Sequence, residues 1–236
     1  MRGNEAIHTG RNMATKKPNC LIVCSGAQQG VSAQSFIHSF TLTHSAFNVF
    51  IVTPEGKQIE FSKIDDNSRR WLNEFRAKPF SVPGKLEDVE SIRYSALLIP
   101  SGLGCCYDLA NHKDLGKILT EFIEDKKPIC AVGHGTSGLF AATSNSGQYW
   151  NFKDYSLTAP SLFEVCQLPE FAHLPVIAED LIKERGATYS SSQNDCVHVV
   201  IDRHVITGQN DNSTLSAVQN LILLCNARQG RQKASN

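Results

Sequence analysis

The residues best placed to do chemistry lie in residues 127–140, with the sequence KPICAVGHGTSGLF. A short apolar run ends at Gly133-His134-Gly135, and small residues then lead into a second apolar segment. This order predicts a strand, a sharp turn and a helix, the geometry that raises a nucleophile above the edge of an α/β sheet. Such a turn needs small flanking residues, and Ala131 and Gly135 supply them. The central position, where Ser or Cys would attack a substrate, is Gly133, which has no nucleophilic atom.

A second glycine-rich loop, residues 100–104 (PSGLG), follows another apolar run. Backbone N–H groups in such a loop can stabilise an oxyanion, so the amides of Leu103 and His134 are candidate donors. The alternative is that the glycines only permit tight turns. Cys105 and Cys106 follow the loop and are candidates for a displaced nucleophile, provided that a base lies within hydrogen-bonding reach. Adjacent cysteines at the start of a helix are more often simply packed.

The elements that would position these residues alternate between strands and helices, which predicts an α/β fold with a mostly parallel sheet. Short apolar runs predict the strands, at residues 20–26, 47–53, 94–100, 129–132 and, in two segments, 196–208. Helical spacing of apolar residues predicts the helices, at residues 31–46, 65–78, 115–127, 136–142, 176–187 and 214–224. Residues 155–165 fit a strand followed by a loop or short helix. Residues 19–227 are expected to form one domain, between a disordered extension (1–18) and a disordered tail (228–236).

The composition argues against several classes of function. The chain has 236 residues, 41% of them hydrophobic, and a formal net charge of zero, which argues against direct nucleic-acid binding. No run approaches the roughly 18 to 20 apolar residues of a membrane span, and the N-terminus lacks the apolar core of a secretory signal. The eight cysteines form no CxxC pair and no zinc pattern, so we expect no metal, no cofactor and a reducing, cytoplasmic setting.

Four segments carry a resemblance to a known family. AVGHG (131–135) resembles the Ala-Val-Cys-His-Gly elbow of the PfpI-like family, in the class I glutamine amidotransferase-like superfamily. Residues 96–110 are similar to its Pro-Gly-Gly-His-Gly loop and following helix, residues 47–57 to its second strand, and residues 197–210 to a late segment. The resemblance covers residues 20–225 and implies one glutamine amidotransferase-like domain with a flavodoxin-like three-layer sandwich. Family activities, which include glyoxalase-type or deglycase-type hydration, peptidase and chaperone activity, depend on the elbow Cys.

The resemblance assigns five site positions in this chain. The nucleophile corresponds to Gly133 and the adjacent histidine to His134, which is retained. The acid that orients the histidine corresponds to Glu164, although a purely structural pair is favoured over a working acid–base dyad for these two residues. The acid that contacts the Cys corresponds to Gln34, whose amide cannot act as a carboxylate, and the loop histidine corresponds to Leu103. Because loss of a nucleophile can cost on the order of 10⁶ in turnover, we expect a vestigial site.

The preferred hypothesis is therefore a non-catalytic member of the family, a pseudoenzyme, that acts as an oligomeric scaffold. The resemblance implies a homodimer or homotetramer without membrane insertion. It also implies other protein partners, in an early-endosome assembly downstream of a Rab GTPase and linked to mRNA transport. One alternative is a small-carbonyl hydrolase or glyoxalase-type enzyme that uses His134 or a displaced Cys. Another is a small-molecule sensor that binds an anion at the Leu103 and His134 amides. A thiol within bonding distance of the His134 imidazole would count against the non-catalytic hypothesis.

Overall fold

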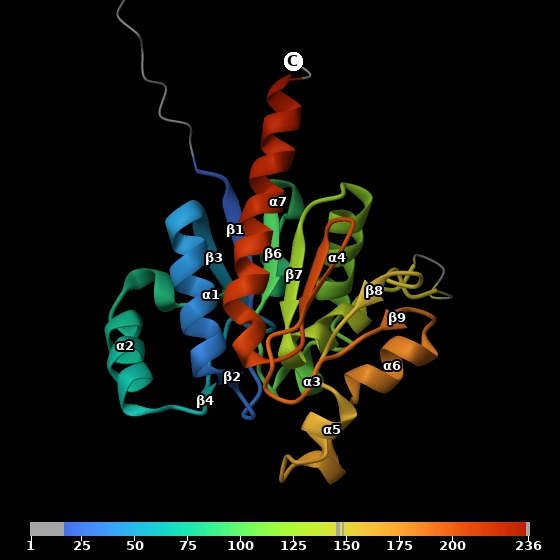
Figure 1. Cartoon of the computed structure of the whole chain (residues 1–236). Coiled ribbons are helices and arrows are strands. Elements are labelled where there is room, and N and C mark those ends of the chain that lie inside the picture. The colour runs from blue at the N-terminus through green and yellow to red at the C-terminus, as the bar shows by residue number, and fades with distance from the viewer. Residues whose placement is uncertain (1–16, 145–146, 148, 235–236) are drawn as a thin grey trace, which may run out of the picture.

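A seven-stranded sheet forms the centre of the protein, as seen in a computed structural model that describes residues 17–144, 147 and 149–234 (Figure 1). The strand order is β10-β11-β7-β6-β1-β3-β5, and all neighbours are parallel except β10 and β11. The strands are β1 (Asn19–Val23), β3 (Asn48–Thr53), β5 (Gly84–Lys85), β6 (Ala96–Ile99), β7 (Ile129–Val132), β10 (Val199–Asp202) and β11 (Val205–Gly208). Two short parallel pairs lie outside it, β2 (Val31–Ser32) with β4 (Phe61–Ser62) and β8 (Ser156–Leu157) with β9 (Thr188–Tyr189).

Helices cover both faces of the sheet, so the predicted flavodoxin-like sandwich with a mostly parallel sheet is confirmed. The α-helices are α1 (Ala33–Ala46), α2 (Asp66–Arg76), α3 (Cys105–Asp108), α4 (Lys113–Glu124), α5 (Leu162–Val165), α6 (Ala178–Glu184) and α7 (Thr214–Ala234). The 3₁₀ helices are η1 (Pro79–Ser81), η2 (Leu86–Asp88), η3 (Ser91–Arg93), η4 (Gly133–Ala141), η5 (Phe171–His173) and η6 (Asp211–Ser213).

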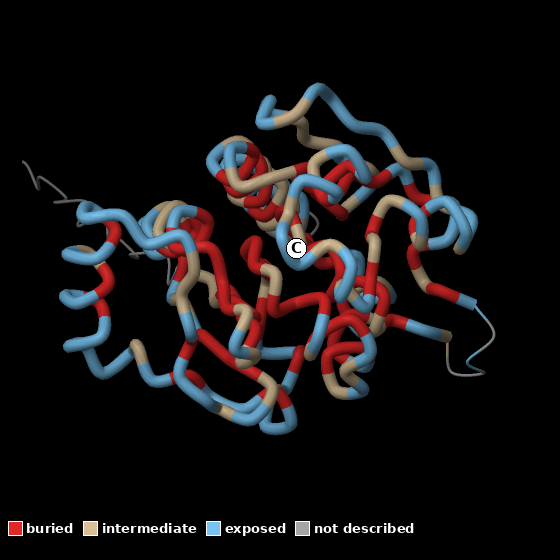
Figure 2. The backbone as a smooth tube through the Cα atoms, turned by 90° about the horizontal axis from the view of Figure 1, so that it is seen from below, coloured by how far each residue is buried: buried red, intermediate tan, exposed pale blue. Residues whose placement is uncertain are grey.

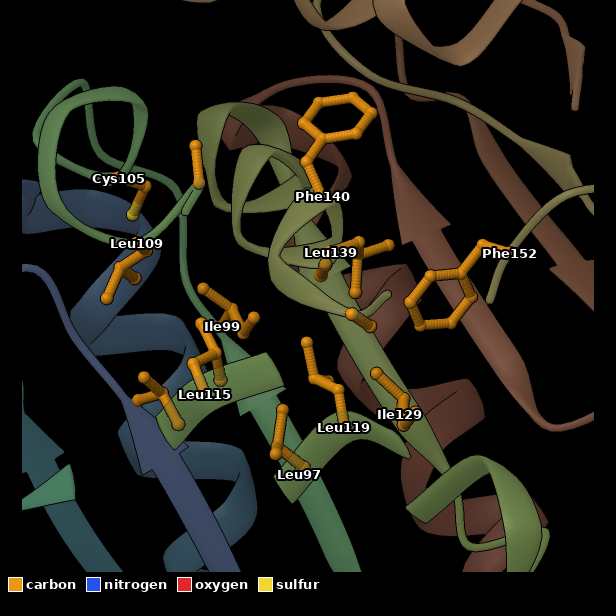
Figure 3. Close-up of a cluster of buried hydrophobic side chains, with 14 of the residues drawn as sticks. Leu97, Ile99, Cys105, Leu109, Leu115, Leu119, Ile129, Leu139, Phe140 and Phe152 are labelled. Atoms are coloured by element: carbon orange, nitrogen blue, oxygen red, sulfur yellow. The ribbon is translucent and has the colours of Figure 1, made fainter. Parts of the chain in front are cut away.

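The two layers of helices produce two separate hydrophobic cores. Successive side chains of a strand point to opposite faces, and β1 shows this alternation. Leu21 and Val23 belong to the core that α3, α4 and η4 cover, whereas Cys20, Ile22 and Cys24 belong to the core under α1, α2 and α7. Figure 3 shows side chains of β6, β7, α4 and η4 gathered in the first of these cores. Because both of their faces are buried, the central strands β6 and β7 are apolar throughout.

Two segments differ from the sequence prediction. Helix α7 continues to Ala234, so residues 228–234 of the predicted disordered tail are helical. Apart from Gly230, the segment consists of Arg, Gln, Lys and Ala, which propagate a helix that tertiary packing has already started. The helix after the elbow is a 3₁₀ helix, η4. Gly135 in this helix packs so closely that an added Cβ would lie 2.6 Å from the Ile99 and Pro100 carbonyl oxygens. Most of the predicted N-terminal extension, residues 1–16, lies outside the described residues.

The carboxyl ends of the parallel strands meet at the lower end of the molecule in Figure 1, where α3 and α5 also lie. Ligand sites of open α/β sheets form at this end. Figure 2 looks at the same end and shows buried backbone in the centre, surrounded by exposed segments.

Candidate vestigial active site

Gly133 is the first residue after β7 and keeps the strained backbone of a nucleophile elbow, with a φ of 53°. Few residues other than glycine tolerate this left-handed conformation without cost. The space above Gly133 is already filled, because a Cβ placed there would lie 2.8 Å from the Cβ of Ser101 and closer still to its hydroxyl oxygen. The position that a nucleophile would occupy is therefore taken by the side chain of Ser101.

Ser101 was not identified as a site residue from the sequence. It is 3% exposed, its backbone N–H donates to the Ser35 hydroxyl (3.0 Å), and its carbonyl accepts from the Ser32 N–H (2.8 Å). In the resembling loop, Pro-Gly-Gly-His-Gly, the corresponding residue is the first glycine. This Gly-to-Ser difference was the available signal, but its meaning depends on Gly133, which lies 32 positions later.

Asp211 lies beside Ser101 and accepts several hydrogen bonds. Its carboxylate accepts from the Ser32 hydroxyl (2.9 Å) and from the Lys63 ammonium (3.1 Å). Burial raises the pKa of Asp211, but Lys63 and the hydroxyls of Ser101 and Ser32 together lower it below the ordinary value of a carboxyl group. A carboxylate with a lowered pKa is a weaker base toward the Ser101 hydroxyl than an ordinary carboxylate is.

His134 contacts a thiol. Its Nδ1 lies 3.7 Å from the Sγ of Cys106, which also lies 3.4 Å from the Ser137 hydroxyl. Burial lowers the pKa of His134 to about 4, against a smaller opposing effect of Asp211. The imidazole is therefore neutral at pH 7 and is a weak base.

Both cysteines after the loop are buried. Burial raises the pKa of the Cys106 thiol, and the side chain is only 3% exposed. Cys105 is completely buried, burial also raises its pKa, and its thiol lies 3.9 Å from the Pro100 carbonyl oxygen. The structure thus brings Cys106, one of the two candidate nucleophiles, to His134, but as a neutral, buried thiol.

Glu164 does not orient His134, which corrects both sequence-based assignments of that pair. No hydrogen bond among the described residues joins the two side chains. The Glu164 carboxylate instead accepts from the N–H of Ser161 (3.0 Å), completing the capping box of α5, and from the side chains of Gln209 and Asn210 (2.9 Å each). It also accepts from the backbone N–H of Asp195 (3.1 Å). These bonds tie α5 to Asp195 and to residues 209–210, so Glu164 is a structural clamp.

A cavity of about 410 Å³ lies at this site. It is lined by Gln34, Lys63, Ser101, His134, Pro160, Glu164, Val165, Gln167, Leu168, Asn194, Asp195, Asn210, Asp211 and Asn212. Gln34 donates to Asn212 (3.3 Å), as an amide rather than the family's acid. Three carboxylates face one lysine in this lining, so the charge disfavours the anion that the sensor hypothesis invoked.

The predicted pair of oxyanion donors is not assembled in this cavity. Leu103 is absent from its lining, and its carbonyl accepts from the Cys106 N–H (3.1 Å) in the turn that starts α3. Ser101 is the residue of that loop that reaches the cavity. Within the described part of the chain, no three His, Cys, Asp or Glu side chains are grouped to hold a metal ion, and no helix is long and apolar enough to cross a membrane.

Comparisons with known proteins show what this chain is similar to. A profile of the DJ-1/PfpI family matches residues 42–150. The glutamine amidotransferase-like class 1 domain-containing protein 1 of Xenopus laevis is 55% identical over 90% of this chain and 92% of its own length. The human protein of the same name is 50% identical over 90% of this chain and 96% of its own length.

Solved structures share the fold. The Francisella tularensis Rapid Encystment Protein 24 KDa superposes with a TM-score of 0.77 at 23% identity, covering 88% of this chain and 99% of that one. Drosophila melanogaster DJ-1beta superposes with a TM-score of 0.59 at 14% identity, covering 87% and 89%. Together with the strained elbow at Gly133, these similarities show that the chain belongs to the DJ-1/PfpI family.

Proposed function

We propose that this protein is a non-catalytic member of its family and works as a protein-binding scaffold subunit. The observation that carries the proposal is the occupied space above Gly133, where the Ser101 side chain takes the place of a nucleophile. The site therefore lacks the nucleophilic atom, and in addition a second residue fills the position where that atom would act.

The resemblance supplies the setting of this proposal. A homo-oligomer would join other protein subunits in an endosomal assembly that acts downstream of a Rab GTPase and bears on mRNA transport. The zero net charge supports protein contacts over direct RNA contacts by this chain.

A second candidate function is an enzyme that uses Cys106, because its thiol lies 3.7 Å from the His134 imidazole, which is the contact expected to count against a non-catalytic member. Three observations weigh against it. The thiol is buried, its pKa is raised, and Cys106 does not line the cavity. A thiolate nucleophile needs the opposite environment, partly exposed and electropositive.

Turnover assays separate the two candidates. The protein is incubated with methylglyoxal and with simple esters and amides, beside Cys106→Ser and His134→Ala. We expect no turnover above the background that all three proteins share. Turnover by the wild type that either substitution abolishes would overturn the non-catalytic proposal.

Sedimentation tests the scaffold half of the proposal. Analytical ultracentrifugation at micromolar concentration is expected to show a dimer or tetramer. A protein that sediments only as a monomer would contradict the oligomeric scaffold, whatever the outcome of the turnover assays.

A further inference from the structure

The cavity beside His134 keeps a negative charge, although most of its polar side chains are hydrogen-bonded. Its lining holds the carboxylates of Glu164, Asp195 and Asp211 and the ammonium group of Lys63, a formal net charge of −2. Lys63 pairs with Asp211 (3.1 Å) and balances that carboxylate. His134 adds no positive charge at pH 7, because burial lowers its pKa to about 4. Glu164 and Asp195 are therefore left without a cationic partner among the described residues.

The hydrogen bonds of Glu164 do not neutralise its charge. Its donors are uncharged groups, the backbone N–H groups of Ser161 and Asp195 and the side-chain amides of Gln209 and Asn210. Such donors stabilise a carboxylate but leave its negative charge to act on the rest of the cavity. A concave surface that carries one sign of charge attracts ligands of the opposite sign.

Asp195 presents a carboxylate that is free to bind a ligand. Its backbone is held in place, since its N–H donates to Glu164 (3.1 Å) and its carbonyl accepts from the Asn212 amide (2.8 Å). Its carboxylate accepts no hydrogen bond from the residues that the structure describes. Asp195 is also exposed, so a ligand can reach this carboxylate from solvent.

Neutral acceptors share the cavity with this carboxylate. Asn212 links Asp195 to Gln34, because the Asn212 amide oxygen accepts from the Gln34 amide (3.3 Å). The amide oxygen of Gln34 and the side-chain amides of Gln167 and Asn194 have no hydrogen-bond partner in the described part of the chain. An ammonium group has three N–H donors and no acceptor, so it needs several oxygen atoms of this kind.

We infer that this cavity binds a linear aliphatic diamine or polyamine. One ammonium group pairs with the Asp195 carboxylate and the neighbouring amide oxygens, and another is attracted by Glu164. Pro160, Val165 and Leu168 provide the apolar part of the lining, which suits the methylene chain between the ammonium groups. The cavity volume of about 410 Å³ lies within the range of small-molecule sites. The inference goes beyond the proposed function, because a protein without turnover can still bind a ligand.

Isothermal titration calorimetry in an amine-free buffer tests the inference with diaminobutane, butanediol and succinate, which share a four-carbon chain. We expect the diamine to bind at least about tenfold more tightly than the diol, and succinate not to bind, because the three molecules differ mainly in charge. Added salt should weaken the binding of the diamine, since it screens the carboxylates.

Asp195→Asn locates the site. It is expected to weaken binding of the diamine by about tenfold or more, because the amide keeps the shape of the side chain but loses its charge. Asp154→Asn is the matched control, since Asp154 is also exposed and has a φ of 65°, close to the 58° of Asp195, but lies outside the cavity lining. Asn tolerates this left-handed backbone as Asp does, so both variants should keep the wild-type unfolding midpoint.

Lys63→Gln tests the role of charge in the opposite direction. Removing the ammonium group that pairs with Asp211 makes the cavity more negative, so the diamine should bind about threefold or more tightly than it binds the wild type. Partial unfolding cannot produce such a gain in affinity.

Four outcomes would overturn the inference. These are no diamine binding up to about 10 mM, equal affinity for the diamine and the diol, equal losses in Asp195→Asn and Asp154→Asn, or unchanged or weaker binding by Lys63→Gln. None of them bears on turnover or sedimentation, so this inference and the proposed function fail separately.

Discussion

Helix α5 separates two concave surfaces that differ in how their side chains are used. On one side lies the cavity beside His134, where polar groups bond mainly to one another: Asp211 to Lys63 and Ser32, and Glu164 to Asn210. On the other side lies an apolar groove, where Leu162 and Phe163 face solvent. The difference teaches that the polar side chains of the cavity are largely committed to one another, while the neighbouring surface leaves apolar side chains exposed.

The largest expected effect comes from adding a methyl group at Gly133, on the cavity side of α5. Gly133→Ala is predicted to destabilise the protein by about 2–5 kcal/mol, from a left-handed backbone of about 1–2 and overlap with Ser101 of about 1–3. Urea unfolding measures the change. Gly147→Ala is the matched control, because Gly147 has a φ of 68° but its added Cβ has no atom within 4 Å from the non-adjacent residues that the structure describes, so only the backbone cost applies.

The double variant Ser101→Gly/Gly133→Ala sharpens the same comparison. Removing the Ser101 side chain relieves the overlap, so the two substitutions are expected to couple by about 1 kcal/mol or more. Strict additivity would contradict the assignment of Ser101 to the nucleophile's position.

The next effect concerns the clamp in the cavity wall. Glu164→Gln is predicted to cost about 1.5–3 kcal/mol, because the amide loses charge-assisted bonds and turns N–H groups toward the donors of Asn210 and Asp195. Hydrogen exchange of the Asp195 amide should accelerate with it. Glu87→Gln, at an exposed ion pair with Lys85, should change stability by no more than about 0.5 kcal/mol. Equal changes in stability for Glu164→Gln and Glu87→Gln would contradict the hydrogen bonds assigned to Glu164.

The smallest effect is a pH dependence from His134. Its pKa of about 4 in the folded protein lies below the ordinary value near 6.5, so the unfolded chain takes up the proton first. The stability that neutral His134 contributes is therefore present above about pH 6.5 and is lost as the pH falls toward 4. The unfolding free energy of the wild type, relative to that of His134→Gln, should be constant at pH 7–8 and lower by about 1 kcal/mol at pH 5. This is less than the full pKa shift would give, because the ring is partly exposed. Curves parallel down to pH 4 would contradict the lowered pKa.

Much of the fold was predictable from local pattern. The apolar run of β7, the Gly133-His134-Gly135 turn and the two strand segments of β10 and β11 were all located from residue types alone. Strand periodicity and turn chemistry act over a few residues, so one sequence is enough to show them. The end of α7 was placed too early, because polar residues that favour a helix resemble a disordered tail in composition.

The candidate site was predictable only in part. The empty nucleophile position at Gly133 was visible in the sequence, and so were Cys106 and His134 as separate candidates. Their contact was not, and neither was the clamp formed by Glu164, because each joins residues that lie far apart along the chain.

The sequence by itself determined the family, the parallel sheet and the absence of a reactive atom at Gly133, since these depend on residue identity and short-range order. Only the tertiary structure decided that the Ser101 side chain occupies the space above Gly133, that the Cys106 thiol is buried against His134, and that Phe163 is left exposed. The physical reason is that burial, overlap and hydrogen-bond pairing are properties of atoms brought together by the packing of separate strand ends.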